Sequence, residues 1–406
     1  MPDAAPTLES IRRAHIEIQK IALVTPVLLS HHLTRKLGSE VWIKAENLQR
    51  AGSFKIRGAY NKISSLSESE RGAGVLTASA GNHAQGVALA ASFFHMSALV
   101  VMPENTPQIK LSRTRAYGAE IIQHGSNLGE AYQHALELVK QTGRIFVPPY
   151  DDWKIIEGQA TLGLEIIDQV PDVESVVVPV GGGGLISGIA LAIRALKPSV
   201  KIYGVQAAGA NPMVRSFREK RPVEVEYVDT IADGVKLTRV GELTFPVIQE
   251  HVDDMVDVSE EEISEAIVQL LEKTHLVSEG AGAVGLAALL GGRLPTLVGK
   301  VCIVVSGGNI DINFMARIIE QGLTKSGRYL TIRTRVRDIP GELFKVMDVL
   351  VDQRANVLDI IHHRAGWKIP VGWTEIEFLL ETTSFEQHED IVRRLREKSY
   401  WVETGG

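Results

Sequence analysis

Hydrophobic positions in the first three quarters of the chain follow two alternating patterns. Short runs rich in branched aliphatic residues indicate buried strands, and longer stretches with apolar residues three or four positions apart indicate helices. The helices between the strands supply the crossover connections that a parallel sheet requires. The pattern predicts an α/β body with strands at Val41–Ile43, Val75–Thr77, Ala98–Met102, Glu120–Gln123, Val176–Pro179, Lys201–Val205 and Val301–Val305, and helices that include Ala84–Phe94, Leu128–Val139 and Glu261–Leu271.

The pattern changes around Lys325, where a shorter C-terminal segment begins. Its order of strand, helix, strand, strand, helix and strand is that of a ferredoxin-like fold, with two helices on one face of an antiparallel sheet. We therefore expect a body over residues 1–325 and a small domain over residues 329–403. The elements expected in the small domain are Tyr329–Val336, Gly341–Val351, Asn356–His362, Thr374–Leu380, Phe385–Lys398 and Tyr400–Val402.

Composition narrows the class of protein. Hydrophobic residues make up 45% and charged residues 23% of the 406 positions, which is typical of a globular chain and not of a disordered one. The net charge is -6, and the basic residues are not clustered in the sequence. Neither nucleic acid nor an anionic membrane surface is therefore an expected partner. The longest uncharged stretch, 175–193, is interrupted by Pro179 and four glycines, and no membrane span is expected. Cys302 is the only cysteine, which excludes an intrachain disulfide and favours a reducing cytoplasm.

A glycine loop, Gly181, Gly182, Gly183 and Gly184, separates the strand at Val176–Pro179 from a helical pattern that starts at Leu185. Without side chains, such a backbone can approach an anion closely, and the N–H groups at the start of the helix point towards it. The loop therefore indicates a phosphate site. Its spacing matches neither the dinucleotide fingerprint nor the lysine-containing P-loop. A flexible glycine turn without a ligand is the alternative.

Three further loops offer chemistry: one has a lysine where a helix should begin, and the other two follow predicted strand ends, where open α/β sheets bind ligands. Taken singly, they are explained by a surface lysine, a helix N-cap and an ordinary turn. Together they supply an amine for a Schiff base and polar partners for a ring, which with the glycine loop suits pyridoxal phosphate. The residues concerned are Phe54 and Lys55, then Ser79, Gly81, Asn82 and His83, and finally Ser306.

Four ordered motifs resemble those of pyridoxal-phosphate threonine dehydratases. They are Ser53–Gly58, Ser79–Gly86, Gly181–Leu185 and Ser306–Asn309, and the resemblance extends from about Thr25 to Gly322. It implies a two-lobed fold like that of the tryptophan synthase β subunit. A smaller lobe, from about Glu46 to Arg144, would be inserted in a larger one, with the cofactor between them. The C-terminal segment resembles an ACT domain.

The resemblance also implies residue roles and a reaction. Lys55 would bind the cofactor aldehyde covalently and act as the base. The expected reaction is β-elimination of L-threonine, and of L-serine, to 2-oxobutanoate or pyruvate with release of ammonia. Phe54 would pack near the cofactor ring, Asn82 would bond the phenolic oxygen of the ring, and Ser306 would face its nitrogen. The phosphate would be held by Gly181, Gly182, Gly183, Gly184 and Leu185. The substrate carboxylate would be bound by Ser79, Gly81, Asn82 and His83.

Alternative functions remain at this point. Serine racemases resemble this chain, but they place a serine at the position of Ala80 and a metal-binding carboxylate at that of Gln206, so racemisation and an essential divalent metal are not expected. A catalytically idle sensor is disfavoured by Lys55, and a nicotinamide oxidoreductase by the glycine spacing. Glu279 is either a group near the cofactor or a charge at a helix N-terminus.

The ACT-like segment indicates regulation and assembly. ACT modules commonly pair and bind an amino acid near the loop after their first strand, here Arg337–Leu343, opposite Asn356. Isoleucine or valine is the candidate effector, which would fit a role in isoleucine biosynthesis, but the sequence names no effector and leaves a biosynthetic and a catabolic role both open. The enzyme is expected to be a homodimer or homotetramer. The alternative is that the segment serves oligomerisation alone.

Overall fold

The computed structural model describes residues 4–297, 299–364 and 369–405. The chain divides into two compact units, one that ends at Asp311 and one that begins at Ile312. This division lies at the N-terminal end of helix α14 (Ile312–Lys325), which is grouped with the second unit, whereas the sequence pattern places the change at the C-terminal end of the same helix, near residue 325. In the described parts of the chain, no helix combines the length and the apolar character needed to cross a bilayer.

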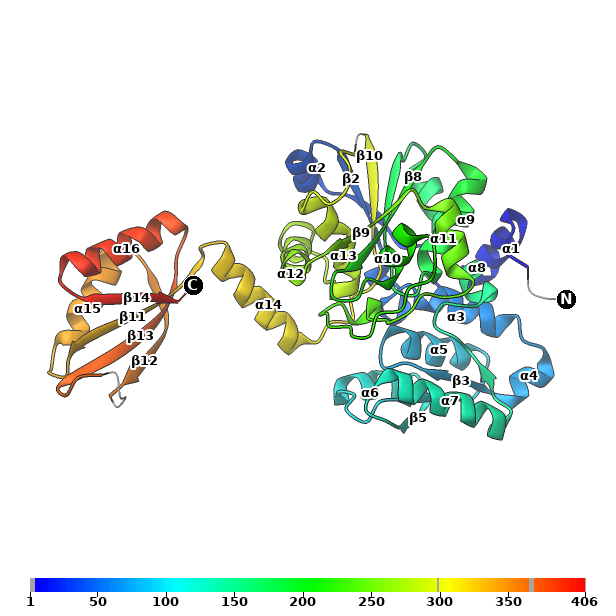
Figure 1. Ribbon diagram of the computed structural model, residues 1–406, viewed down its shortest axis with the longest axis horizontal. Helices are drawn as coiled ribbons and strands as arrows, with labels where there is room; N and C mark the ends of the chain where they lie inside the picture. Colours follow the sequence, from blue (N-terminus) through cyan, green and yellow to red (C-terminus); the bar gives the residue numbers. More distant parts are fainter. Residues whose placement is uncertain (1–3, 298, 365–368, 406) are drawn as a thin grey trace. The chain divides into compact units, whose positions relative to one another are not determined.

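The first unit contains a six-stranded sheet whose order explains where the site forms (Figure 1). Only β1 runs antiparallel to its neighbour, and the other pairings are parallel. β10 lies between β2 and β7, with Val301 opposite both Val41 and Ser175. The C-terminal ends of β2, β10 and β7 therefore lie side by side at the same end of the sheet. The segments that follow these strands carry Lys55, Ser306 and the glycine loop, respectively. In sheet order the strands are β1 (Val27–Leu29), β2 (Glu40–Ala45), β10 (Lys300–Val305), β7 (Ser175–Pro179), β8 (Lys201–Ala207) and β9 (Asp254–Val258).

A second, four-stranded parallel sheet lies within the same unit. β3 leads at its C-terminal end into the loop of Ser79 and Asn82. The last strand of this sheet follows Arg144, so the sheet continues past the end expected for the smaller lobe. In sheet order the strands are β5 (Glu120–Gln123), β4 (Ala98–Met102), β3 (Val75–Ala78) and β6 (Ile145–Phe146).

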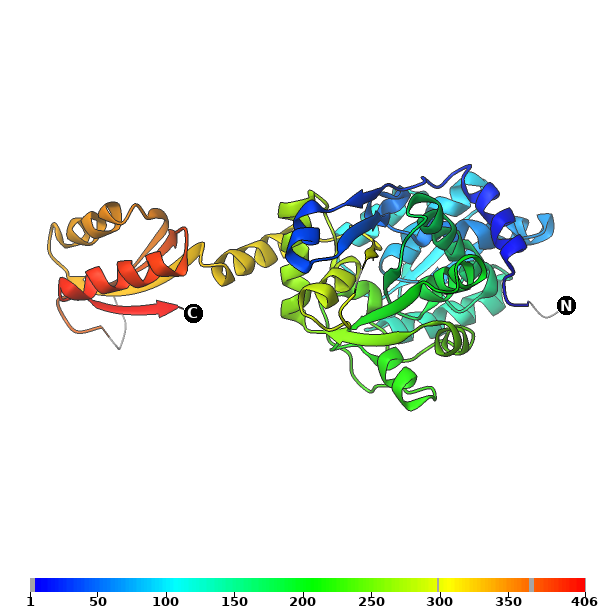
Figure 2. The same ribbon diagram turned by 90° about the horizontal axis from the view of Figure 1, so that it is seen from above.

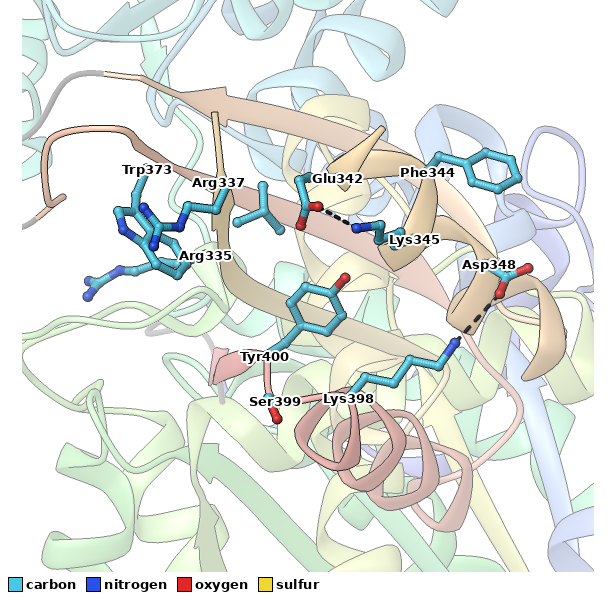
Figure 3. A pocket seen from close by; sticks show the side chains of 11 residues that line it. Arg335, Arg337, Glu342, Phe344, Lys345, Asp348, Trp373, Lys398, Ser399 and Tyr400 are labelled. Atoms are coloured by element: carbon cyan, nitrogen blue, oxygen red, sulfur yellow. Dashed lines mark hydrogen bonds and ion pairs between the residues drawn. The ribbon is translucent and has the colours of Figure 1, made fainter. Parts of the chain in front are cut away.

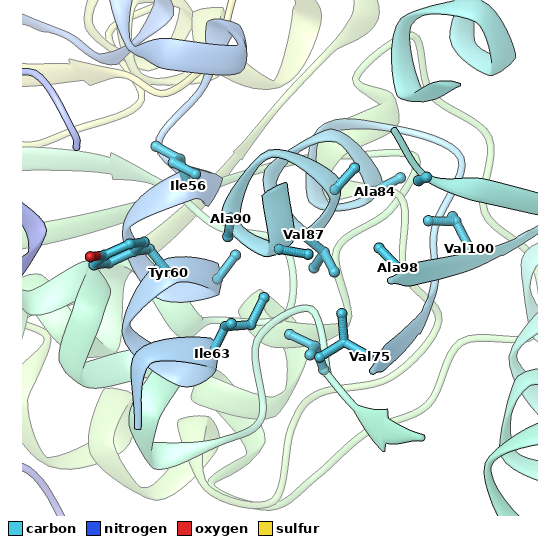
Figure 4. Close-up of a cluster of buried hydrophobic side chains, with 14 of the residues drawn as sticks. Ile56, Tyr60, Ile63, Val75, Ala84, Val87, Ala90, Ala98 and Val100 are labelled. Carbon is cyan, nitrogen blue, oxygen red and sulfur yellow. The ribbon is translucent and has the colours of Figure 1, made fainter. Parts of the chain in front are cut away.

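Helices surround both sheets of the first unit. Figure 4 shows α3 and α5 packed together, with Ile56 and Ile63 of α3 and Val87 and Ala90 of α5 in one buried cluster. The helical segments are α1 (Leu8–Ile18), α2 (His31–Leu37), η1 (Glu46–Leu48), η2 (Arg50–Gly52), α3 (Lys55–Ser64), α4 (Glu68–Ala73), α5 (Asn82–Phe93), α6 (Gln108–Arg115), α7 (Leu128–Thr142), α8 (Trp153–Gln169), α9 (Gly184–Leu196), α10 (Pro212–Glu219), η3 (Asp233–Val235), α11 (Thr244–His251), α12 (Glu260–Gln269), η4 (Leu270–Thr274) and α13 (Gly280–Leu290).

A buried ionic cluster ties α3 to β2 and α8. The Arg57 guanidinium donates to both carboxylate oxygens of Glu46, at 2.8 Å each, and to Glu165 at 2.6 and 2.9 Å. The Lys44 ammonium reaches Glu165 at 2.6 Å and the carbonyl oxygen of Thr25 at 2.7 Å. The four charged side chains of this cluster are at most 3% exposed. Each charge is paired, so the cluster fixes the direction of α3, the helix that begins at Lys55.

The C-terminal unit has the predicted βαββαβ order. Its antiparallel sheet has the order β12-β13-β11-β14, and alternate residues of β11 and β13 are buried beneath α15 and α16, which lie on one face (Figures 1 and 2). The last strand begins at Trp401, one residue after the predicted start. The elements are β11 (Tyr329–Arg337), α15 (Glu342–Asp352), β12 (Asn356–His363), β13 (Trp373–Glu381), α16 (Phe385–Glu397) and β14 (Trp401–Gly405).

Candidate active site

Lys55 is the first residue of α3, and its amine points at the loop that follows β6. Its Nζ donates to the carbonyl oxygen of Pro149 at 2.8 Å and lies 5.1 Å from the centre of the Phe54 ring. Burial disfavours the ammonium form and lowers the pKa of Lys55 to about 8, although the Glu279 carboxylate acts in the opposite direction. An amine with this pKa is neutral more often at physiological pH than an ordinary lysine, as a nucleophile or a base must be.

Ser306 is bonded through the backbone to Phe54, the residue before Lys55. The N–H of Phe54 donates to the carbonyl oxygen of Ser306 at 3.1 Å, and Ser53 forms a β-bridge with Gly307. The first and last of the four sequence motifs are therefore neighbours, although about 250 residues separate them in the chain. Ser306 is 4% exposed at the end of β10.

Asn82, the first residue of α5, is held by two groups that follow distant elements. Its Nδ2 donates to Glu279 Oε1 at 2.5 Å, and its Oδ1 accepts a hydrogen bond from Asn309 Nδ2 at 2.7 Å. A Cβ built on Gly307 would lie 2.5 Å from the same Glu279 oxygen and 3.1 Å from Asn82 Nδ2. Burial raises the pKa of Glu279 to about 7, against the lowering effect of the Asn82 hydrogen bond. Glu279 is therefore placed at the site as well as at the N-cap of α13.

The loop before Asn82 is compact, and its side chains are not all directed the same way. The Ser79 hydroxyl accepts a hydrogen bond from the Gly81 N–H at 3.2 Å, and a Cβ on Gly81 would meet open space. The His83 ring is 3% exposed, and its Nε2 lies 2.9 Å from the carbonyl oxygen of Val147. Burial and the Lys55 charge lower the pKa of His83 to about 3, so the ring is neutral. The His83 ring is thus engaged with Val147, which leaves its backbone N–H at the helix start for an anion.

The glycine loop packs tightly on an aromatic ring. A Cβ on Gly182 would lie 2.3 Å from ring carbons of Tyr150, and one on Gly184 would lie 3.0 Å from Tyr150 Cβ. Gly183 has a φ of 94°, which disfavours any residue with a side chain. The Thr244 hydroxyl donates to the carbonyl oxygen of Gly182 at 2.6 Å. Leu185 is 5% exposed and packs into the core next to the loop.

The segment between β6 and α8, residues 147–152, was not identified from the sequence as part of the site. Asp151 accepts hydrogen bonds from the N–H groups of Glu242 and Leu243, both at 2.9 Å, and so fixes the turn that carries Thr244. Asp152 is the N-cap of α8. From the sequence, an aspartate before a helical pattern indicates this capping role and no role at a site. Residue spacing gives no signal for the contacts of Pro149, Tyr150 and Asp151, because their partners are distant in sequence.

These contacts place the Lys55 amine and the glycine loop against consecutive residues. Lys55 contacts Pro149, and Gly182 and Gly184 contact Tyr150. The glycine loop opens α9, whose first N–H groups have no partner within the helix. A phosphorylated aldehyde fits this arrangement, with Lys55 at the aldehyde, the loop at the phosphate, and Asn82 and Ser306 at the ring. Such a group supplies an electron sink for the carbanion that forms when an α-proton leaves an amino acid.

Gln206 occupies the position at which racemases were expected to carry a metal-binding carboxylate. Its side chain is fully buried on β8, and its Oε1 accepts a hydrogen bond from the Val214 N–H at 3.0 Å. Among the residues that the structure describes, no three His, Cys, Asp or Glu side chains are grouped as metal ligands.

The comparisons with known proteins agree with this geometry. Residues 18–307 match the family of pyridoxal-phosphate dependent enzymes. The chain is 48% identical to L-threonine ammonia-lyase of Thermotoga maritima, over 98% of this chain and 100% of that protein. The structure of the processed form of threonine deaminase isoform 2 from Solanum lycopersicum is 39% identical, with a TM-score of 0.73 over 78% of this chain and 89% of that one. Maize serine racemase is 34% identical, with a TM-score of 0.75 over 79% of this chain and 99% of that one. The chain belongs to the family of pyridoxal-phosphate-dependent enzymes.

Proposed function

We propose that this enzyme is an L-threonine ammonia-lyase, which converts L-threonine to 2-oxobutanoate and ammonia and accepts L-serine as a second substrate. The observation that carries the proposal is the contact of Lys55 with Pro149 beside the packing of the glycine loop on Tyr150, because it brings a low-pKa amine to an anion site. The near full-length similarity to a protein named L-threonine ammonia-lyase supports the choice of reaction.

Each site residue has a role in this proposal. Lys55 holds the cofactor, and its amine removes the α-proton once it is released. The N–H groups of the glycine loop bind the phosphate, with Leu185 packed behind them, while Phe54 borders the ring. Asn82 donates to the ring oxygen, because its Nδ2 carries a second hydrogen beyond the one given to Glu279. Ser79, Gly81, Asn82 and His83 bind the substrate carboxylate, and His83 contributes its backbone N–H.

Ser306 influences the choice of reaction. If the group is bound with its ring nitrogen towards Ser306, this hydroxyl would not hold the nitrogen protonated by charge pairing as an aspartate would, and the group would be a weaker electron sink. With the group bound, a weaker electron sink at Ser306 would favour loss of the β-hydroxyl over transfer of the amino group. Ser306→Asp should therefore increase amino-group transfer from L-alanine to a 2-keto acid. An unchanged transfer rate in a well-folded variant would contradict this role.

The test of the function is an assay of purified holoenzyme with L-threonine and L-serine. We expect 2-oxobutanoate and pyruvate, respectively, in a one-to-one ratio with ammonia, and no keto acid from Lys55→Ala. Formation of D-serine at a rate comparable to that of keto acid would support the racemase alternative instead. Ala80 supports the lyase, because a methyl group has no proton to exchange with a substrate.

We further propose that the C-terminal unit is an ACT domain that binds a branched-chain amino acid and assembles the chain into a homodimer or homotetramer. A hollow of about 550 Å³ in this unit supports an effector site, since Arg337 and Glu342 border it together with the rings of Trp373 and Tyr400 (Figure 3). Addition of isoleucine or valine to the full-length enzyme should change its threonine kinetics, and Arg337→Ala should weaken that response. An identical response in the variant would place the effector elsewhere.

The cellular role follows from the same proposal. An inhibitory response to isoleucine would indicate a biosynthetic enzyme, because an end product then limits its own synthesis. A cytoplasmic location is supported by the single cysteine, Cys302, which is fully buried and has no disulfide partner. The division of the body into a smaller and a larger lobe is supported by its two separate sheets.

A further inference from the structure

Lys110 and Asp233 form an ion pair between the two sheet-bearing parts of the catalytic body. Lys110 lies on α6, which packs against α5 and β5 next to the second sheet, and Asp233 is the first residue of η3, which contacts α13 beside the six-stranded sheet. Lys110 Nζ lies 2.6 Å from Asp233 Oδ2, and the side chains are 26% and 67% exposed. The ion pair therefore joins, at the protein surface, a helix beside the second sheet to a turn beside the six-stranded sheet.

The η3 segment connects this ion pair to the proposed phosphate site. A Cβ on Gly181 would lie 3.1 Å from the carbonyl oxygen of Gly234 and 3.2 Å from Val235 Cα. A Cβ on Gly234 would lie 3.5 Å from Glu279 Oε1, the oxygen that accepts from Asn82. The backbone that follows Asp233 thus packs on the first glycine of the loop and borders the carboxylate that holds Asn82.

One other contact between these parts, the Arg57 cluster, differs in kind. The side of α3 that faces α8 has the Arg57 cluster, which is buried and paired on every side. The Lys110–Asp233 pair is single and partly in water, where an ion pair shifts an equilibrium by less than about tenfold and weakens as salt is added. Such a bond can break and re-form during each turnover, whereas the Arg57 cluster cannot open cheaply.

We propose that Lys110 and Asp233 are a positioning pair that holds η3 against the phosphate loop and restrains the exchange of small molecules at the site. Neither residue touches the reacting atoms, so each acts through the backbone of Gly234 and Val235. When the pair is broken, η3 and α6 move apart more often, and the cofactor and the substrate leave faster. The inference rests on the proposed phosphate site, and it concerns exchange and not the chemical step.

The test compares full-length holoenzymes at low ionic strength. Lys110→Gln and Asp233→Asn should each raise the rate of cofactor release into an aldehyde-trapping buffer, and the KM for threonine, by about two- to fivefold, with little change in kcat. Lys110→Arg should restore both values, because it keeps the charge. The doubly exchanged variant, Lys110→Asp with Asp233→Lys, should recover a substantial part of the loss.

Salt and a matched control separate this role from general destabilisation. In about 1 M salt, where the screening length is about 3 Å, wild type and variants should converge. Arg293→Gln removes an exposed pair with Glu262 at 2.8 Å that does not involve α6 or η3, and it should leave cofactor release unchanged. Equal release rates in wild type and both single variants at low salt would overturn the proposal. So would an increase in Arg293→Gln as large as that in Lys110→Gln. Either of these two results would overturn only the role of the ion pair. The proposed function would stand as long as the wild-type enzyme still produces 2-oxobutanoate from threonine.

Discussion

Asn82 donates its side-chain amide to Glu279 across 2.5 Å, and this bond joins two residues that are 197 positions apart. Asn309 holds the other end of the same amide at 2.7 Å and also donates to the Ala51 carbonyl oxygen at 2.7 Å. The orientation of Asn82 is therefore set by groups that follow β10 and precede α13. One amide hydrogen of Asn82 stays available for a ligand.

Removal of Asn309 should loosen this arrangement. Asn309→Ala leaves the Asn82 oxygen without this donor, and we expect cofactor affinity to fall by about 1–2 kcal/mol, or roughly five- to thirtyfold. Spectroscopic titration of the apoenzyme with pyridoxal phosphate measures the change. Asn105→Ala removes an exposed hydrogen bond to the Ser126 carbonyl oxygen and is the matched control. Equal affinities in the two variants would show that Asn309 does not orient Asn82.

Glu279 should make the stability of the apoenzyme fall as pH rises between about 4.5 and 7. Its pKa in the folded protein is raised to about 7, so over this range the unfolded chain loses the proton while the folded chain keeps it. Urea unfolding at pH 5 and pH 7.5 should show the wild type losing on the order of 1–3 kcal/mol relative to Glu279→Gln, which has no such proton. Parallel pH profiles for the two proteins would mean that Glu279 is ionised at the lower pH.

The Lys55 amine should react as a low-pKa lysine in the apoenzyme. Its pKa is lowered to about 8 by burial, so its rate of acetylation by acetic anhydride should rise through about pH 8, well below the range of surface lysines. Mass spectrometry of the peptide that contains Lys55 gives this rate, with the peptide of the exposed Lys20 as an internal reference. Glu279→Gln should move the midpoint lower, because the Glu279 carboxylate raises this pKa. A shift to higher pH would contradict that assignment.

The contact of Gly182 with Tyr150 should make the glycine irreplaceable. Gly182→Ala places a methyl group 2.3 Å from carbons of the Tyr150 ring, so the loop must move and cofactor affinity should fall at least tenfold. Gly182→Ala combined with Tyr150→Ala should recover part of that loss, since the ring is the obstacle. Gly72→Ala, on α4, meets no atom within 4 Å and should change nothing at the site. A double variant as weak as Gly182→Ala would assign the defect to the backbone.

The Arg57 cluster should contribute strongly to stability. Arg57→Met leaves the carboxylates of Glu46 and Glu165 buried without their main partner, and the free energy of unfolding should fall by about 3–5 kcal/mol. Arg13→Met removes an exposed pair with Glu9 on α1 and should cost less than about 1 kcal/mol. Denaturant unfolding of both apoenzyme variants makes the comparison, and similar losses would show that the cluster is no stronger than a surface pair.

Local parts of the fold and site could be predicted from the sequence. Val176–Pro179 is continuously apolar because its strand is buried on both faces, and the glycines that follow lie in consecutive positions, so both strand and loop are evident within a dozen residues. The alternation in β11 and β13 likewise predicted the sheet of the C-terminal unit, since side chains on successive residues point to opposite faces. The sequence did not indicate which atoms of His83 face the site, and in the structure its ring is turned to Val147.

The sequence by itself determined the element types, the parallel architecture and the residues with reactive groups, because periodicity and backbone freedom are properties of neighbouring residues. Only the tertiary structure decided which groups meet. β10 lies between β2 and β7, which brings Ser306 to Phe54, and the segment after β6 places Pro149 at Lys55 and Tyr150 at the glycine loop. The Asn82–Glu279 and Lys110–Asp233 bonds likewise connect residues more than a hundred positions apart. Burial then set the pKa values of Lys55 and Glu279, because the cost of a charge depends on the solvent excluded by residues far away in the chain.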